Sequence, residues 1–168
     1  MDEETRIRAF LQSGYPAVVA GLELTSGSRA VAEDAVHEAL ARAWLRMERG
    51  DAIESLQAWV TTVATNLVRS RFRRIRAERR ARQRIGPEGS EERGTRSEER
   101  LDLRRALDGL SDRQREVVVL HYYLGMPVSE VAKTIGTSEG TVKKTLHRAR
   151  AALARALGED YSTTRGER

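Results

Sequence analysis

The segment "SEVAKTIGTSEGTVKKTLHRAR" (residues 129–150) decides the fold of the C-terminal part of the chain. Apolar residues recur at helical spacing before Gly136 and again after Ser138, so two short helices should flank a tight turn at 136–138. Ser138 is a strong candidate for the N-cap of the second helix, which we expect to run to about Leu157. The segment therefore predicts a helix-turn-helix.

The second of these helices has a basic outer face. Packing its apolar residues against the first helix leaves charged side chains pointing outward. In a helix-turn-helix such side chains reach base edges in the major groove, where Lys and Arg donate to guanine. A solvated basic face on an ordinary helical hairpin is the alternative. The outward residues are Glu139, Lys143, Lys144, His147 and Arg148.

Positive charge is concentrated elsewhere too. The 168 residues carry a net charge of +5, yet residues 69–84 alone hold nine Arg and one Glu. So many cations repel one another unless a polyanion such as a nucleic-acid backbone neutralises them. A solvated helix end or a membrane-surface helix are alternatives, although the segment lacks a large apolar face after Ile75. The arginines are Arg69, Arg71, Arg73, Arg74, Arg76, Arg79, Arg80, Arg82 and Arg84.

Acidic residues gather in a third segment, "AEDAVHEALARAW" (32–44). Here Glu33, Asp34 and Glu38 are expected to form an acidic face beside an apolar one. Acid on a chain that otherwise favours polyanions suggests a protein partner, with charge setting the orientation of docking. Acids placed at a helix start because of the helix dipole explain the segment equally well.

The chain as a whole is predicted to be all-α, because no run shows the period-two alternation of strands. Residues 86–100 hold Gly, Pro, Ser and charge but no large apolar residue, which is typical of a flexible linker. We therefore expect two small helical domains at 1–84 and 101–157, a charged linker at 85–100 and a disordered tail at 158–168. Helices are expected at 15–25, 30–47, 56–85, 98–110, 111–125, from Pro127 to near Gly136, and 138–157.

Local signals sharpen two of these helix boundaries. Ser111 with Gln114 three residues later fits a capping box, and Gly125 fits the left-handed position after a helix end. Pro127 is suited to the first position of the following helix. We expect Trp44 and Trp59 to lie in the core of the first bundle; stacking platforms for bases are the alternative.

Several functional classes are disfavoured by the composition. The chain has no Cys, which excludes disulfides, thiolate metal sites and Cys nucleophiles. The three His lie on different predicted helices, so we predict no catalytic site, no metal site and no cofactor. No apolar run approaches the roughly 20 residues that span a bilayer. We expect a cytoplasmic, nucleoid-associated protein without membrane insertion.

The order and spacing of the segments resemble the extracytoplasmic-function (ECF) group of bacterial RNA polymerase sigma factors, within the sigma-70 family. The resemblance rests on 32–44, on "LQAWVTTVATNLVRSRFRR" (56–74) and, after the linker, on residues 106–153. It implies a sigma region 2 domain and a sigma region 4 domain. Such a protein binds core RNA polymerase, directs it to specific promoters and helps to melt DNA, without being an enzyme.

The resemblance also implies roles for individual residues. Glu33, Asp34 and Glu38 would dock on the β′ clamp helices of the polymerase, whose β flap is a second contact. The loop "RGDAIESLQAW" (49–59) would capture a flipped base of the single-stranded −10 element. An anti-sigma protein is a further partner that the family suggests. The residues that contact the −10 element would be Arg49, Asp51, Ser55, Asn66, Arg69 and Arg73. The residues that contact the double-stranded −35 element would be Thr141 and the outward residues of the second helix, Glu139, Lys143, Lys144, His147 and Arg148.

The sequence departs from the family pattern at two places. His37 stands where the family often has Gln, and the loop before Trp59 is longer than in some relatives and holds no aromatic residue. Two other functions are alternatives. A free-standing helix-turn-helix regulator would not need the acidic helix or the Arg segment, and a nucleic-acid enzyme such as a recombinase would need a nucleophile cluster that the sequence lacks.

Overall fold

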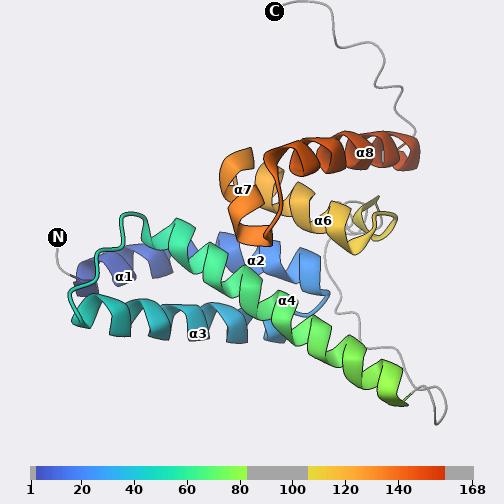
Figure 1. Cartoon of the computed structure of the whole chain (residues 1–168). Helices are drawn as coiled ribbons and strands as arrows, with labels where there is room; N and C mark the ends of the chain where they lie inside the picture. The colour runs from blue at the N-terminus through green and yellow to red at the C-terminus, as the bar shows by residue number, and fades with distance from the viewer. Residues whose placement is uncertain (1–2, 83–105, 158–168) are drawn as a thin grey trace, which may run out of the picture. The chain divides into compact units, whose positions relative to one another are not determined.

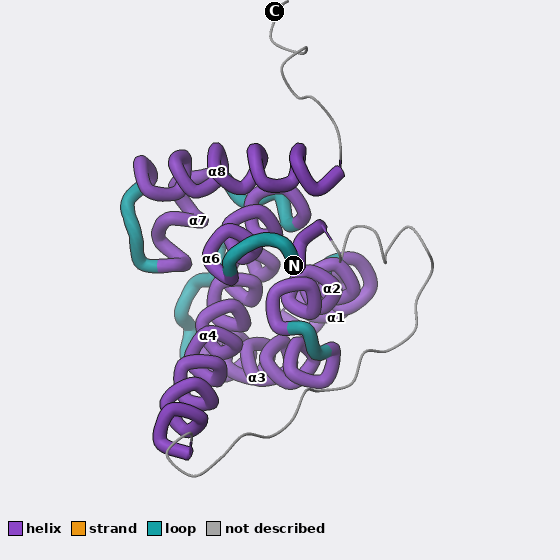
Figure 2. The backbone as a smooth tube through the Cα atoms, turned by 90° about the vertical axis from the view of Figure 1, so that its right-hand side faces the viewer, coloured by secondary structure: helices purple, strands orange, loops and turns teal. Residues whose placement is uncertain are grey.

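The structure is a computed structural model that describes residues 3–82 and 106–157, with side chains described for 3–74 and 106–155. All regular structure in these described ranges is helical (Figures 1 and 2), as the sequence predicts. The linker predicted at 85–100 lies outside the described residues, as do the tail, Arg84 and the side chains of the other arginines beyond Arg74.

The chain separates into two compact units, Met1–Gly94 and Thr95–Arg168. The first unit is a bundle of four helices, with α3 packed on α2 and on the long α4 (Figure 1). Its core is built almost entirely from Val, Leu and Ala, and Leu22, Val36 and Val60 are among its most deeply buried side chains. The helices are α1 Glu3–Ser13, α2 Tyr15–Ser26, α3 Arg29–Glu48 and α4 Leu56–Arg82.

Helix α1 was not predicted, because its charged sequence shows few apolar positions. It is nevertheless part of the bundle, since Phe10 is buried and Ile7 packs against the core. Gly14 joins α1 to α2 at a point of close approach, where an added Cβ would lie 2.7 Å from the Phe10 ring. The turn before α3 is also shorter than expected: Gly27 takes a left-handed φ of 73°, and Ser28 caps α3 by accepting from the Val31 N–H.

The two tryptophans of the first unit differ in burial. Trp59 on α4 is half-buried and packs against the core, in line with the prediction. Trp44 on α3 is 39% exposed, so its predicted place in the core is wrong. Near the C-terminal end of α3, the face that packs inward carries Ala43 and Met47. Position 44 follows Ala43 directly, so its side chain is turned by about 100° away from that face.

The second unit contains the predicted helix-turn-helix. The capping box at Ser111 and Gln114 is present, and Ser111 precedes the first fully described helix. The expected single helix to 125 is instead an α-helix followed by a π-helical turn, in which the Leu124 N–H donates to the Val119 carbonyl over 2.9 Å. The helices are α6 Asp112–Val118, η1 Val119–Tyr123, α7 Val128–Ile135 and α8 Glu139–Leu157.

Residues 125–127 lead from the π-helical turn into α7. Gly125 has the predicted left-handed backbone, with a φ of 69°. Pro127 is the N-cap of α7 and not its first helical residue, which places the start of α7 one residue later than predicted. The His121 Nδ1–H donates to the Met126 carbonyl over 2.8 Å, which fastens the loop to the π-helical turn. His121 is half-buried, as the sequence indicates.

Candidate functional site

The turn between α7 and α8 is fixed by its two end residues. Gly136 ends α7 with a φ of 65°, and the N–H of Thr137 donates back to the Ala132 carbonyl over 2.9 Å. Ser138 then caps α8, because its Oγ accepts from the Thr141 N–H over 3.2 Å. These bonds satisfy backbone groups that the two short helices would otherwise leave open, and they hold α8 at a set angle to α7 (Figure 1).

Burial divides α8 into two faces, as predicted. Val142, Leu146 and Ala149 are at most 5% exposed and pack with Val131 and Ile135 of α7 in the core of the unit. Leu153, which continues this face at helical spacing, is half-buried. The opposite face is entirely solvent-accessible. Its exposed residues are Glu139, Thr141, Lys143, Lys144, His147 and Arg148.

Two arginines of α6 brace the second unit. Arg113 donates to the Ile135 carbonyl at the end of α7 over 3.3 Å and pairs with Glu116 at 3.0 Å. Arg115 donates from Nε to the Leu107 carbonyl over 3.0 Å, at the end of the preceding helical segment. Both guanidiniums thus bond to backbone carbonyls within the unit, whereas the cations of α8 face solvent. Sequence analysis did not distinguish these two roles.

Helix α4 carries a polar stripe on its exposed side. Asn66, Arg69 and Arg73 follow one another at spacings of three and four residues, which places them on one face of the helix. Asn66 and Arg73 are exposed, and Arg69 is half-buried. This arrangement brings together three of the six residues that the sequence assigns to the −10 element.

The other three lie in or beside the loop between α3 and α4. Arg49 and Asp51 are exposed, and the Asp51 carboxylate lies 3.5 Å from the Nε of Arg46. Ser55 has a structural task that the sequence reading missed, because its Oγ accepts from the Ala58 N–H over 3.2 Å and so caps α4. The loop is therefore ordered at both ends.

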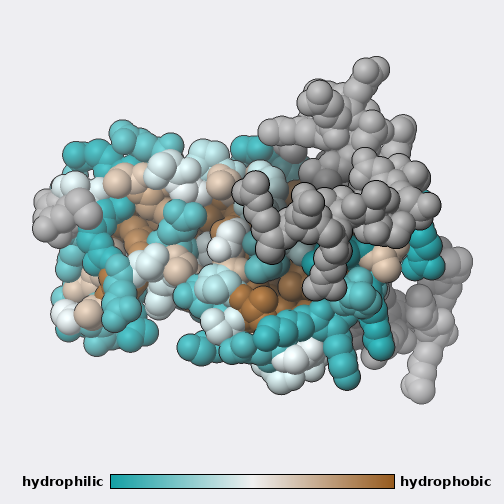
Figure 3. Space-filling model, turned by 90° about the horizontal axis from the view of Figure 1, so that it is seen from above, coloured by the Kyte–Doolittle hydropathy of each residue, from teal (hydrophilic) through white to brown (hydrophobic). Residues whose placement is uncertain are grey.

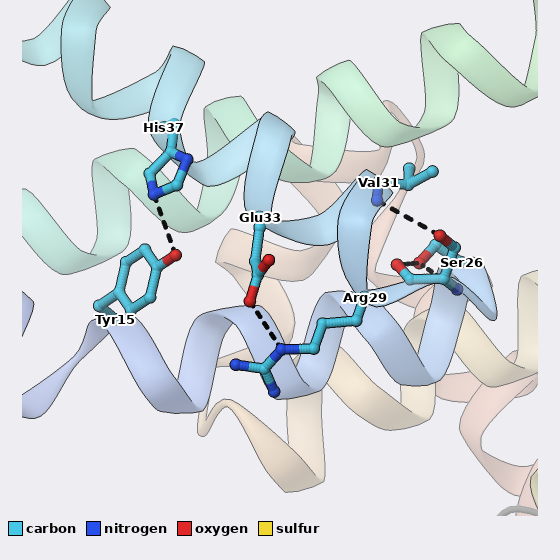
Figure 4. Close-up of polar contacts among 7 residues, drawn as sticks. Tyr15, Ser26, Arg29, Val31, Glu33 and His37 are labelled. Atoms are coloured by element: carbon cyan, nitrogen blue, oxygen red, sulfur yellow. Dashed lines mark hydrogen bonds and ion pairs between the residues drawn. The ribbon is translucent and has the colours of Figure 1, made fainter. Parts of the chain in front are cut away.

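The acidic residues of α3 do not form the single face that the sequence predicts. Asp34 and Glu38 line a groove between α3 and α4 together with Arg71 and Arg74. Glu33 lies on a different side of α3, where its carboxylate pairs with Arg29 at 2.6 Å (Figure 4). The reason is helical geometry: positions 34 and 38 are one turn apart, whereas position 33 is rotated by about 100° from position 34.

His37 lies beside Glu33 on α3 and contacts α2. Its ring stacks on Tyr15 with centroids 5.6 Å apart, and its Nε2 lies 3.0 Å from the Tyr15 hydroxyl (Figure 4). Burial raises the pKa of the Tyr15 hydroxyl, and the nearby Glu33 carboxylate raises it further, while Arg29 partly opposes the shift. The unusual His37 therefore participates in an α2–α3 contact in this structure.

The groove between α3 and α4 is a hollow on the surface of the first unit. It has a volume of about 580 Å³ and an apolar floor that includes Val31, Ala35 and Leu67. Its rim carries carboxylates from α3 and guanidiniums from α4. Elsewhere the surface is mainly hydrophilic, with smaller hydrophobic patches, on the face drawn in Figure 3. Large apolar side chains are exposed at Leu11, Trp44, Leu45, Tyr122 and Tyr123.

The described part of the chain holds no group of three or more His, Asp or Glu side chains that could bind a metal ion. In the same residue ranges, no helix combines the length and the apolar character needed to cross a membrane. The features available for binding are thus the outer face of α8, the stripe on α4 with the adjacent loop, and the α3–α4 groove.

Comparison with known proteins agrees with this division into two units. The family model for Sigma-70 region 2 matches residues 11–78, and the model for Sigma-70 region 4 matches residues 100–153. The ECF RNA polymerase sigma factor SigL of Mycobacterium tuberculosis H37Rv is 38% identical over 149 residues, which cover 82% of this chain and 80% of SigL. The chain belongs to the ECF RNA polymerase sigma factors.

Other relatives support the same membership. The ECF sigma factor EcfG of Rhodopseudomonas palustris is 30% identical over 161 residues, covering 92% of this chain and 86% of EcfG. The sigma factor RpoE of Bartonella quintana, solved in complex with the anti-sigma factor NepR, superposes with a TM-score of 0.74 at 28% identity and covers 92% of this chain and 98% of RpoE. The present sigma factor thus serves promoter recognition in transcription initiation, with regions 2 and 4 as its two units.

Two features of this sigma factor had no visible signal in the sequence. Arg6 of α1 bonds to the backbone of the loop between α3 and α4, 47 residues away. The π-helical turn leaves Tyr122 and Tyr123 about half exposed beside the helix-turn-helix. Neither a long-range side-chain bond nor a π-turn changes local periodicity, so pattern analysis of a single sequence does not detect them.

Proposed function

We propose that this ECF sigma factor reads two promoter elements with separate surfaces and docks on core polymerase with a third. Its region 4 unit reads the double-stranded −35 element, and its region 2 unit holds the single-stranded −10 element. It is a non-catalytic specificity subunit that works in the cytoplasm at the nucleoid. The observation that carries the proposal is the fully exposed basic face of α8 within the helix-turn-helix.

The −35 element is assigned to this face because its geometry suits a major groove. The cap at Ser138 leaves the N-terminal turn of α8 accessible, and Glu139 and Thr141 lie there. Lys144 and Arg148 lie one turn apart, as do Lys143 and His147 beside them. Their cations donate to guanine edges or to phosphates, while the Thr141 hydroxyl is placed to meet a phosphate.

The −10 element is assigned to the polar stripe of α4 and the loop before it. Asn66, Arg69 and Arg73 offer an amide and two cations along one line, which suits a strand of alternating bases and phosphates. An extruded base must be held in a fixed pocket, because unstacking costs a few kcal/mol. Arg49 and Asp51 supply charged groups at the loop, and Ser55 supports the loop by capping α4.

The polymerase is assigned to the acidic side of the α3–α4 groove. Asp34 and Glu38 are exposed and lie on one side of α3, so a basic helical partner could reach both carboxylates at once. The partner surfaces are the β′ clamp helices and, at a separate contact, the β flap. Glu33, which faces α2, has a weaker claim to this role than the sequence suggested. An anti-sigma protein that competes for these surfaces would keep the factor inactive.

Run-off transcription tests the whole proposal. Core RNA polymerase mixed with this chain should start specific transcripts from a genomic promoter library, whereas core enzyme alone should not. Size-exclusion chromatography should show co-elution of the chain with core polymerase. If neither co-elution nor a specific transcript is found, the proposed division of surfaces fails, and a free-standing DNA-binding role would be tested next by operator selection.

A further inference from the structure

One side chain links the loop between α3 and α4 to the N-terminal helix. The Arg6 Nη2 on α1 donates to the carbonyl oxygen of Ile53 and, over 3.4 Å, to that of Glu54. The bond to Ile53 is partly buried, although the loop side chains around it are largely exposed. A single guanidinium therefore holds two successive carbonyls in place.

The two ends of the loop between α3 and α4 are restrained by other bonds. The Arg6 bonds therefore restrain the middle of this loop. At the start, Gly50 takes a φ of 82° and its N–H donates to the Met47 carbonyl over 2.8 Å. At the end, Ser55 caps α4. Between these ends, the buried Ile53 side chain anchors the loop on the core side, and the Arg6 bonds fix the orientation of the peptide groups that follow it.

Fixed orientation matters for reading a base. A pocket that selects among bases must keep its donors and acceptors within roughly 0.5 Å of the productive geometry, and it needs support from residues outside the pocket to do so. The loop carries Arg49, Asp51 and Glu54, all exposed. An arginine can donate to a base edge or a phosphate, and a carboxylate can accept from a base amino group. If the peptide groups of residues 53 and 54 rotate, the positions of these side chains relative to one another are no longer fixed.

We propose that Arg6 is a positioning residue for base selection at the −10 element. It does not touch DNA: it acts by locking the loop that does. The inference rests on the proposed role of this loop and adds a determinant that lies outside the segment matched by the region 2 family model, which begins at residue 11. Helix α1 is thereby part of the promoter-reading apparatus as well as of the bundle core.

The test compares Arg6→Ala with Arg8→Ala in the full chain bound to core polymerase. Arg8 is a matched control because it lies on the same helix, has the same charge and pairs only with Glu4, at 2.6 Å, among the contacts described. Single-round transcription is measured on promoters that carry each of the four bases at each −10 position. Hydrogen exchange of a peptide spanning residues 49–56 is measured on the same proteins.

Arg6→Ala should reduce the ratio between the best and the worst base at one −10 position by about fivefold or more. It should also speed exchange of the loop amides, which include the Asp51 N–H bonded to the Arg46 carbonyl over 3.2 Å. Arg8→Ala should change neither. Arg6→Lys should give an intermediate base preference, because an ammonium can still donate to these carbonyls but lacks the fixed planar geometry of the guanidinium. This second variant also keeps the test valid if Arg6→Ala does not fold.

Three results would count against the inference, and they are distinguishable. Unchanged loop exchange in Arg6→Ala means that Arg6 does not order the loop, and the proposed function of the loop then stands untouched. Faster loop exchange with an unchanged base preference means that the loop does not select the base, which removes Arg49 and Asp51 from the proposed −10 site. Arg6→Ala could instead lower the midpoint of thermal unfolding while the folded protein keeps its loop exchange and its base preference. That result would show that Arg6 has a purely structural role, and it also counts against the inference.

Discussion

Asp34 on α3 and Arg71 on α4 face each other across the groove, with the Asp34 Oδ2 3.4 Å from the Arg71 Nη1. Their side chains are 71% and 52% exposed. An ion pair this exposed contributes about 0–1 kcal/mol to stability, because water screens the charges and both side chains lose freedom. Asp34 can therefore exchange this intramolecular cation for one on a partner at little cost.

This pair leads to a prediction about polymerase binding. Reversing charge with Asp34→Lys and Glu38→Lys should weaken binding to core polymerase by about tenfold or more, because like charges would meet at the interface. The midpoint of thermal unfolding and binding to a −35 duplex should stay close to wild type. Affinity is measured by fluorescence anisotropy of the labelled chain titrated with core enzyme.

Glu33→Lys is the matched control, since it reverses the same charge on the same helix but on the side that faces α2. It should weaken polymerase binding much less than the double variant. An equal or greater loss in Glu33→Lys would contradict the assignment and move the docking surface to the α2 side of α3.

A second prediction concerns α8. Lys144→Ala and Arg148→Ala should each cost about 1–3 kcal/mol of binding to the preferred −35 duplex if the side chain contacts a base, and should relax the preference at one base pair. A phosphate contact would instead weaken all sequences equally and lower the salt dependence of log K by about one unit. Duplex binding as a function of salt, measured on a set of single-base variants, separates the two cases.

Arg155→Ala serves as the control on the same helix. Arg155 is exposed like the others, but it lies near the C-terminal end of α8, where its Nε donates to the Ala151 carbonyl over 3.2 Å. Its removal should leave the −35 preference intact. A change of preference in Arg155→Ala equal to that in Arg148→Ala would show that general charge, and not position on the recognition face, governs binding.

The helix-turn-helix was predictable because local chemistry specifies it. A helix end near Gly136, an N-cap at Ser138 and apolar residues at helical spacing all act within about 20 residues, and the structure confirms each. Trp44 was misplaced because periodicity alone does not say which residue at the edge of an apolar stripe turns inward. The packing of α3 against α2 and α4 decides that.

The same limit applies to the candidate sites. Glu33 and Asp34 are neighbours in sequence, yet Glu33 pairs with Arg29 on its own helix whereas Asp34 pairs with Arg71 of α4, and only the bundle arrangement reveals the second pair. Arg6 could not be assigned because its acceptors are backbone carbonyls 47 and 48 residues away, which no residue pattern encodes. Sequence analysis thus found the elements that carry the charges but not the partners of those charges.

A third prediction tests the turn itself. Gly136→Ala should destabilise the second unit by about 1–2 kcal/mol, because the left-handed backbone at φ 65° disfavours a Cβ. Nothing lies within 4 Å of an added Cβ, so the cost is backbone strain without a clash. Gly136→Asn should cost less, since Asn tolerates this conformation. Urea unfolding followed by far-UV circular dichroism measures the difference.

Tryptophan fluorescence provides the internal control for Gly136→Ala, because both Trp residues belong to the first unit. The fluorescence transition should be the same in wild type, Gly136→Ala and Gly136→Asn. An equal loss of stability in Ala and Asn would indicate that the side-chain volume at this turn, and not its backbone angle, sets the cost.

The last prediction concerns pH and the contact between α2 and α3. Burial and the Glu33 carboxylate raise the pKa of Tyr15 in the folded chain above its ordinary value of about 10. Between the unfolded and the folded pKa, the folded state binds more protons than the unfolded state, so the free energy of unfolding falls as pH rises. The contribution of Tyr15 to the free energy of unfolding is complete below about pH 10 and is lost as pH rises through the folded pKa.

Urea unfolding of the first unit, followed by Trp fluorescence, should therefore show that the free energy of unfolding declines above about pH 10. The decline should be smaller in Tyr15→Phe, because phenylalanine keeps the ring but cannot ionise. An equally steep decline in Tyr15→Phe would mean that ionisation of Tyr15 does not govern the stability of the first unit at alkaline pH.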